Sequence, residues 1–147
     1  MNSDFLDMLS ALSAAGADYL VVGAFAMSAH GYTSATGYID IWVRPTAENA
    51  ERVWRAIAAF GAPTGDLQLT DLHTPDVVFQ IGRPPRRINL LTSIAGVSFE
   101  TAWASRHTVT ISGTNVSFLS RELLIANKRA TGRPRDLADA EWLEQEP

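Results

Sequence analysis

The sequence of 147 residues contains no cysteine, so the chain has neither a disulfide framework nor a thiolate metal site. Long hydrophobic runs are also missing, because no apolar stretch approaches the roughly 20 residues that a membrane-spanning helix needs. Positive charge is not in excess, and the formal net charge is −4 at pH 7. That balance argues against a dedicated nucleic-acid-binding protein.

What is present is an ordinary globular composition, with 46% hydrophobic and 19% charged residues. The length suits one domain over residues 1–147. The start of the chain, MNSDFLDMLSAL, has no basic leader and carries two aspartates, so we expect no signal peptide and a cytoplasmic protein. Five of the twelve basic residues fall in one short stretch: Arg121, Lys128, Arg129, Arg133 and Arg135.

Hydrophobic periodicity and turn residues predict an α/β (α+β) fold, a mixed sheet flanked by helices and followed by C-terminal helices. The first helix is expected between an N-cap at Ser3 and Gly16. Further helices are predicted at 24–31, 46–60, 98–105, 121–130 and 134–144. Strands are predicted at 18–23, 34–43, 67–70, 77–82, 87–92, and in a hairpin on either side of Gly113-Thr114.

The segment SATGYIDIWV at 34–43 is the most unusual of these strands. Because side chains alternate across a strand, Tyr38, Asp40 and Trp42 share one face and three aliphatic residues occupy the other. A single carboxylate therefore lies between two large aromatic side chains.

The order of motifs resembles the nucleotidyltransferase superfamily, the polymerase-β-like fold. Four segments carry the resemblance, which covers most of the chain: YLVVGAFAMSAHGY, SATGYIDIWV, FQIGRPPRRINLLTSIAGVSFETAW and LIANKRATGRPRDLADAEWL. In particular, the sequence is similar to small bacterial members related to the nucleotidyltransferase toxins of abortive-infection systems.

The resemblance implies two-metal phosphoryl transfer, in which three carboxylates hold two Mg²⁺ ions beside a glycine turn that approaches phosphates. This sequence departs from that pattern. Ala24 replaces the second glycine of the turn, and Ser34 replaces an arginine. Tyr38 and Asn89 stand at the positions of the first and third carboxylates, so Asp40 alone remains. We therefore expect no metal site and no cofactor, and absent or very weak Mg²⁺-dependent nucleotidyl transfer.

These departures concentrate in the expected cleft. Positions outside the metal site still fit the family, namely Gly96, Phe99, Asn127, Lys128, Gly132, Asp136 and Asp139. The pattern indicates a scaffold whose active site was remodelled, by natural divergence or by engineering.

The remaining cleft residues suggest Asp40 as a general base in an aromatic-lined pocket for a small, planar molecule. Tyr38 or Asn89 would donate a hydrogen bond to developing negative charge. We expect apolar walls from Trp42 and, beside it, from Phe25 and Met27. The competing interpretation is that Asp40 is a relic, with Tyr38 and Trp42 filling the emptied site.

The other candidate ligand contacts come from the glycine turn and from the basic C-terminal segment. Gly23 and Ala24 would let backbone approach the ligand. His30 is either a second acid–base group or a helix-end residue that bonds a backbone carbonyl. Lys128 is either a surviving phosphate contact or part of a solvated helix face, and two nearby aspartates, Asp136 and Asp139, are expected to cap or pair with the arginines.

Three functions follow. The first is a metal-independent enzyme that abstracts a proton from a small, planar or aromatic molecule with Asp40. The second is a weakly active or inactive nucleotidyltransferase relative that still binds nucleotide through Gly23 and Lys128. The third is a non-catalytic module that binds a ligand or a partner, such as an antitoxin-like component. Nucleic acid and membranes are not expected partners.

Overall fold

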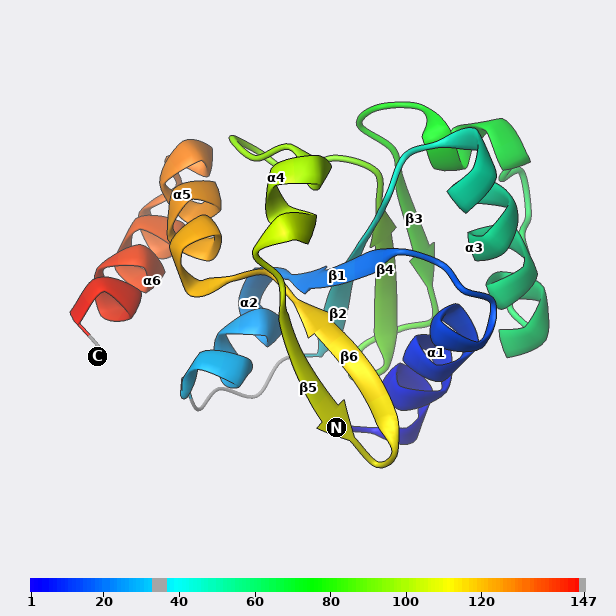
Figure 1. The fold of residues 1–147 in the computed structure, drawn as a ribbon, viewed down its shortest axis with the longest axis horizontal. Coiled ribbons are helices and arrows are strands. Elements are labelled where there is room, and N and C mark those ends of the chain that lie inside the picture. The colour runs from blue at the N-terminus through cyan, green and yellow to red at the C-terminus, as the bar shows by residue number, and fades with distance from the viewer. Residues whose placement is uncertain (33–36, 146–147) are drawn as a thin grey trace.

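The computed structural model describes residues 1–32 and 37–145. Within these residues the chain forms one six-stranded mixed sheet with the order β3-β4-β2-β1-β6-β5 (Figure 1). The strands are β1 (Tyr19–Val22), β2 (Tyr38–Val43), β3 (Val78–Ile81), β4 (Arg87–Leu91), β5 (His107–Ile111) and β6 (Thr114–Phe118). The start of the strand predicted at 34–43, including Ser34, lies outside the described residues.

Six α-helices and two 3₁₀ segments connect and flank these strands in the described part of the chain. The α-helices are α1 (Ser3–Ala14), α2 (Gly23–Ala26), α3 (Ala47–Phe60), α4 (Phe99–Ala104), α5 (Arg121–Thr131) and α6 (Pro134–Gln145). The 3₁₀ segments are η1 (Met27–His30) and η2 (Leu69–His73). The predicted α/β class, mixed sheet and C-terminal helices are therefore confirmed.

Several local predictions were wrong in detail. The N-cap of α1 is Asn2, whose side chain accepts a hydrogen bond from the Phe5 backbone N–H at 3.0 Å, and Ser3 is the first helical residue. The strand expected at 67–70 is replaced by η2, because Asp71 accepts the Gln68 N–H and closes a capping box.

The helix expected at 24–31 is divided into α2 and η1. The turn between β5 and β6 lies one residue earlier than predicted, at Ser112-Gly113, where both residues have positive φ. Positive φ at both central residues is what the common two-residue hairpin turn requires.

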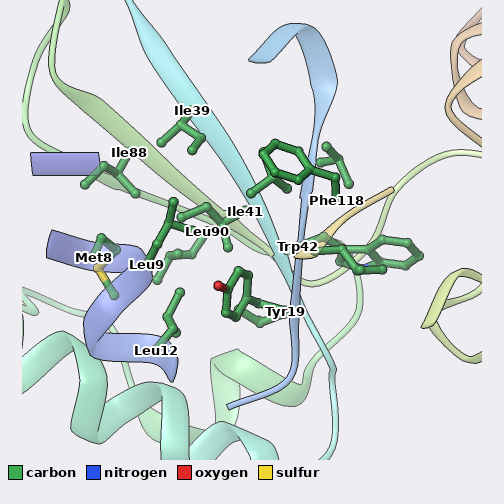
Figure 2. Packing of buried hydrophobic residues seen from close by; sticks show 14 of the residues in the cluster. Met8, Leu9, Leu12, Tyr19, Ile39, Ile41, Trp42, Ile88, Leu90 and Phe118 are labelled. Atoms are coloured by element: carbon green, nitrogen blue, oxygen red, sulfur yellow. The ribbon is translucent and has the colours of Figure 1, made fainter. Parts of the chain in front are cut away.

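One face of the sheet packs against α1 and α3. Ile39, Ile41 and Val43 are fully buried on this face, as the strand alternation predicted. Figure 2 shows Leu9 and Leu12 of α1 directed toward this aliphatic layer, which β4 continues with Ile88 and Leu90. This layer fixes which face of β2 is inside, and so directs the alternate residues to the opposite face.

The opposite face is covered unevenly. At the C-terminal end of β2, Trp42 packs against Phe99 of α4 with 5.0 Å between ring centroids. Tyr38 and Asp40, nearer the start of the strand, instead line a cavity. Its far wall comes from α5 and α6, which lie on the other side of the molecule from α1 and α3 (Figure 1).

Asn49, a buried residue of α3, ties the end of β2 to the start of β1. Its Oδ1 accepts a hydrogen bond from the Asp18 N–H at 2.8 Å. Its Nδ2 donates to the Asp18 and Arg44 carbonyls, each at 3.0 Å. The two strands that flank the cavity are thereby held in register at the end remote from it.

No described helix has both the length and the apolar character needed to cross a membrane.

Replacing Asn49 with alanine tests this connection. Asn49→Ala would leave the Asp18 N–H without this partner and would remove one of two hydrogen bonds to each of the Asp18 and Arg44 carbonyls. We expect a loss of about 2–4 kcal/mol in the free energy of unfolding. Urea denaturation measures the loss, with Glu51→Ala on the exposed side of the same helix as the control. A loss no greater than that of the control would show that Asn49 does not hold the strands.

Candidate functional site

A cavity of about 420 Å³ opens between the sheet and the C-terminal helices. Its sheet side comes from the end of β1 and the start of β2, its floor from the segment after β4, and its far wall from α5 and α6. The lining residues are Val22, Gly23, Ala24, Tyr38, Asp40, Leu91, Ser93, Ile94, Ala95, Asn127, Lys128, Thr131, Arg133, Arg135, Asp136 and Asp139. Gly23, Ala24, Tyr38, Asp40 and Lys128 are thus brought together as the sequence predicted.

Asp40 is fixed on both sides of its carboxylate. Asn89 stands directly opposite Asp40 on β4, and its Nδ2 donates to Asp40 Oδ1 at 2.8 Å. On the other side, Gly23 follows Val22, the β1 partner of Asp40, and lies so close that a Cβ atom there would be 2.5 Å from Asp40 Oδ2. Gly23 also has a φ of +69°, which favours glycine.

A second cross-strand pair lies beside the first. Arg87 stands opposite Tyr38 in the β2–β4 register, and its guanidinium lies over the Tyr38 ring, 5.0 Å from the centroid. Each cavity-lining residue of β2 therefore has one polar partner on β4. The sequence interpretation missed Arg87, although aligning Tyr38-Ile39-Asp40 with Arg87-Ile88-Asn89 as parallel neighbours would have found it.

Asn89 is buried beside Asp40 and outside the cavity lining. One N–H of its amide donates to Asp40 Oδ1. Its Oδ1 has no hydrogen-bond partner among the described residues. In the structure the contact that the Asn89 side chain makes is with Asp40.

Burial raises the pKa of Asp40 above its ordinary value. The hydrogen bond from Asn89 and the positive charges of Arg87, Lys128 and Arg133 act in the opposite direction and offset only part of the desolvation. A raised pKa makes a carboxylate a stronger base once it is ionised. The site thus combines a restrained geometry with enhanced basicity.

Lys128 is buried in the far wall between two carboxylates of α6. Its Nζ donates to Asp139 Oδ2 at 3.0 Å and lies 3.5 Å from Asp136 Oδ1. Asp136 also accepts from Arg133 at 2.7 Å and from Thr131 at 2.7 Å. Burial excludes the interpretation of a solvated helix face. A phosphate contact would have to compete with two internal ion pairs of Lys128.

The two aspartates of this wall differ in their partners. Asp136 pairs with an arginine, Arg133, as the sequence predicted, whereas Asp139 pairs with Lys128. Burial alone would raise the pKa of Asp136, but Thr131, Arg133 and Lys128 together hold it below the ordinary value. Asp136 is therefore an ionised structural partner of the wall.

The segment after β4 is held against α5 by two contacts. Asn127 Nδ2 donates to the Ala95 carbonyl at 2.9 Å. A Cβ atom at Gly96, where φ is +75°, would lie 2.6 Å from the Ala130 Cβ, so only glycine permits this approach. These two residues fix the floor of the cavity and leave its chemistry to other side chains.

The aromatic walls predicted from the sequence are not found. Trp42 is on the predicted face but is buried against α4 rather than in the cavity. Phe25 packs edge-on against Phe5 at 5.7 Å, and Met27 is buried in the core. Of the predicted aromatic residues, Tyr38 alone lines the cavity, so the pocket is mainly aliphatic and charged.

His30 also lies outside the cavity lining. Its Nε2 is 3.1 Å from the Leu119 carbonyl oxygen, and its ring centroid is 5.6 Å from that of His107. This geometry agrees with the interpretation of a helix-end histidine that bonds a backbone carbonyl. His30 is therefore not positioned as a second acid–base group for Asp40.

Comparison with solved structures identifies the architecture. The crystal structure of a presumed nucleotidyltransferase from Thermotoga maritima superimposes with a TM-score of 0.60, over 96% of this chain and 88% of that chain, at 14% sequence identity. The chain has a nucleotidyltransferase-like fold. No family model matches the sequence, and no curated protein matches it significantly.

The residues of the cavity do not fit the two Mg²⁺ ions that this fold implies. Among the described residues, no three carboxylate, histidine or cysteine side chains are grouped to hold a metal ion. The neighbours of Asp40 on the sheet are the phenol of Tyr38 and the amide of Asn89. In the far wall, Asp136 and Asp139 form ion pairs with Arg133 and Lys128. Magnesium prefers several anionic oxygen ligands, which this donor set lacks.

Gly23→Ala measures how closely the glycine turn confines Asp40. Gly16 offers a matched control, because its φ of +71° is similar and a Cβ there would meet nothing within 4 Å. We expect Gly16→Ala to cost about 1–2 kcal/mol from backbone strain alone. Gly23→Ala should cost a further 1–3 kcal/mol, roughly the range for overpacking, as measured by chemical denaturation. Equal costs would mean that the carboxylate moves aside freely.

The raised pKa of Asp40 has a consequence for stability. The folded chain holds this proton more tightly than the unfolded chain, whose pKa is near the ordinary 3.8. The stabilisation is thus complete below that value and is lost as the pH rises through the folded pKa. Asp40→Asn, which keeps an acceptor for Asn89, should raise the free energy of unfolding at neutral pH, and the gain should disappear in acid.

Urea denaturation across this pH range would measure the effect, with Asp7→Asn on the exposed face of α1 as the control. A wild-type protein more stable than Asp40→Asn at neutral pH would contradict the prediction, because the ionised carboxylate would then be stabilising.

Proposed function

We propose that this chain is a metal-independent enzyme on a remodelled nucleotidyltransferase scaffold, in which Asp40 abstracts a proton from a small molecule. One observation carries the proposal. Asp40 lines a cavity, is desolvated, and has its carboxylate confined between the Asn89 amide and Gly23. A base held in this way loses little freedom on reaching the transition state.

The proposed step uses only groups of this chain and its substrate. The Asp40 carboxylate accepts a proton from an acidic C–H group of the substrate. The electron pair of that bond moves into an adjacent electron-withdrawing group or expels a leaving group, and the neutral Asp40 acid then returns the proton to product or solvent. The reaction is of the lyase or isomerase type, and Asn89 serves as a positioning residue.

Negative charge that develops on the substrate would be stabilised by the rest of the cavity. Tyr38 lines the cavity two residues before Asp40 on the same strand, and its hydroxyl is the proposed donor. The charges of Lys128 and Arg133 reach Asp40 and act on the same region. Preorganised donors and charges of this kind supply the largest part of many catalytic effects.

The substrate is proposed to be a small molecule with an apolar body. The cavity volume of about 420 Å³ lies within the range of ordinary small-molecule sites. Val22, Leu91 and Ile94 supply aliphatic contacts, and Tyr38 supplies the aromatic one. A planar substrate would therefore lie between aliphatic side chains rather than stack in an aromatic cage.

Nucleotide binding without transfer is a second candidate, favoured by three basic residues in one cavity: Lys128, Arg133 and Arg135. Two of the three already pair with carboxylates, which weakens this reading relative to the first. Calorimetry with ATP and Mg²⁺ separates the two, because micromolar, Mg²⁺-dependent affinity would support the second candidate and contradict the first.

A partner-binding module remains the third proposal from the sequence. A stable protein that co-purifies with the chain, together with a melting temperature that no small ligand shifts, would favour it over both ligand-binding proposals.

A nitro-substituted benzisoxazole tests the proposed chemistry directly. A base removes its ring C–H proton, the N–O bond breaks, and the single product is a nitrophenolate that carries the new nitrile group and whose absorbance reports the rate. We expect the rate to rise with pH in a single step. The midpoint of that step should lie above the ordinary Asp pKa, because burial raises the pKa of Asp40. Asp40→Asn should lower kcat/KM by about 100-fold or more.

The exposed Asp7→Asn variant controls for an unspecific loss of charge. Asn89→Ala should displace the midpoint of the step along the pH axis, since it removes the hydrogen bond that lowers the pKa of Asp40. Full activity in Asp40→Asn would show that Asp40 is not the base.

A further inference from the structure

The charges that line the cavity are equal in number. Three are carboxylates, Asp40, Asp136 and Asp139, and three are cations, Lys128, Arg133 and Arg135. Internal ion pairs engage four of the six, since Asp136 and Asp139 hold Lys128, and Asp136 also holds Arg133. Within the described ranges, Asp40 and Arg135 are the two lining charges that form no ion pair.

These two charges lie in different parts of the cavity. The cavity lining reaches from the sheet to the C-terminal helices, and each of the two charges comes from one of these sides. Asp40 is on the sheet side and Arg135 is in the first turn of α6. A ligand that spans the cavity would therefore meet a base at one end and a free guanidinium at the other.

The backbone that carries Arg135 is firmly held, although its side chain is exposed. Thr131 Oγ1 lies 2.7 Å from Asp136 Oδ2 and 2.9 Å from the Lys128 carbonyl oxygen, within hydrogen-bond distance of both for its one proton, which closes the connection between α5 and α6. Arg133 adds its own bond to Asp136. Arg135 thus stands on a fixed turn and has an exposed side chain at the cavity wall, where it is accessible to an anion.

We infer that Arg135 forms an anion subsite, and that the substrate is a carbon acid bearing a carboxylate or phosphate group remote from the proton it loses. The substrate class rests on the proposed function of Asp40. Bidentate hydrogen bonds from a guanidinium match both anions, and the distance from Asp40 limits repulsion between the ligand's charge and the base. The aliphatic residues between the two ends would hold the uncharged body.

The subsite is tested with unreactive, planar ligands that need no catalysis. Calorimetry compares an indazole carboxylate, its methyl ester and the corresponding phosphonate on the wild type, Arg135→Gln and Arg55→Gln. Arg55 is an exposed arginine on α3, remote from the cavity lining, and is the matched control. We expect the wild type and Arg55→Gln to bind an anionic ligand at least tenfold more tightly than the ester, and Arg135→Gln to lose that preference.

Equal affinity for acid and ester, an unchanged preference in Arg135→Gln, or no binding of either anion would overturn the subsite. The affinities of the carboxylate and the phosphonate show which of the two anions is preferred.

Turnover separates this inference from the proposed function. A benzisoxazole with a carboxylate on its benzo ring is compared with its methyl ester, and Arg135→Gln should reduce the ratio of the two kcat/KM values through KM. Activity that survives in Asp40→Asn would overturn the general-base proposal while the calorimetric preference still supports the subsite. Activity that depends on Asp40 but shows no preference for the acid would overturn the subsite alone.

Discussion

The parallel pairing of β2 with β4 is the constraint on which the rest of the site depends. It places Asp40 opposite Asn89 and Tyr38 opposite Arg87, so two cavity-lining residues each receive one polar partner. A shift of one residue in this register would exchange the inner and outer faces of the strand. The buried Ile39 and Ile41 on the reverse face prevent that shift, because they would have to leave the core. Hydrophobic packing on one face thus aligns the polar chemistry on the other.

The same arrangement explains how a lone carboxylate is tolerated away from water. Burial of a charge is costly unless it is hydrogen-bonded or paired, and Asp40 has one hydrogen bond and three positive charges acting at longer range. This compensation is partial, as the raised pKa shows. Carboxylates that serve only structure are more fully compensated, as Asp136 is in the far wall. Asp40 and Asp136 thus differ in how far their surroundings compensate the cost of burial.

Sequence reasoning located the face of the site but not its boundary. Alternation along β2 correctly placed Tyr38, Asp40 and Trp42 together, yet two residues along a strand span about 6–7 Å, which is enough for a different element to cover the next side chain. Here α4 covers Trp42. The partners of Lys128 were equally hidden, because they depend on how α6 folds back on α5. Periodicity within one element predicts a face, whereas contacts between elements require the tertiary arrangement.

The basic residues of the far wall do not form a positive surface. A run of basic residues in a sequence suggests a positive surface, but two of the three that reach the cavity are neutralised by α6. For Lys128 the pairing matters because its ammonium group is buried, and a buried charge is costly without close partners. Arg135 is therefore distinguished because no carboxylate among the described residues pairs with it, and not by its position in the run of basic residues. Among the described residues, the cavity lining therefore keeps one carboxylate, Asp40, and one cation, Arg135, that form no ion pair.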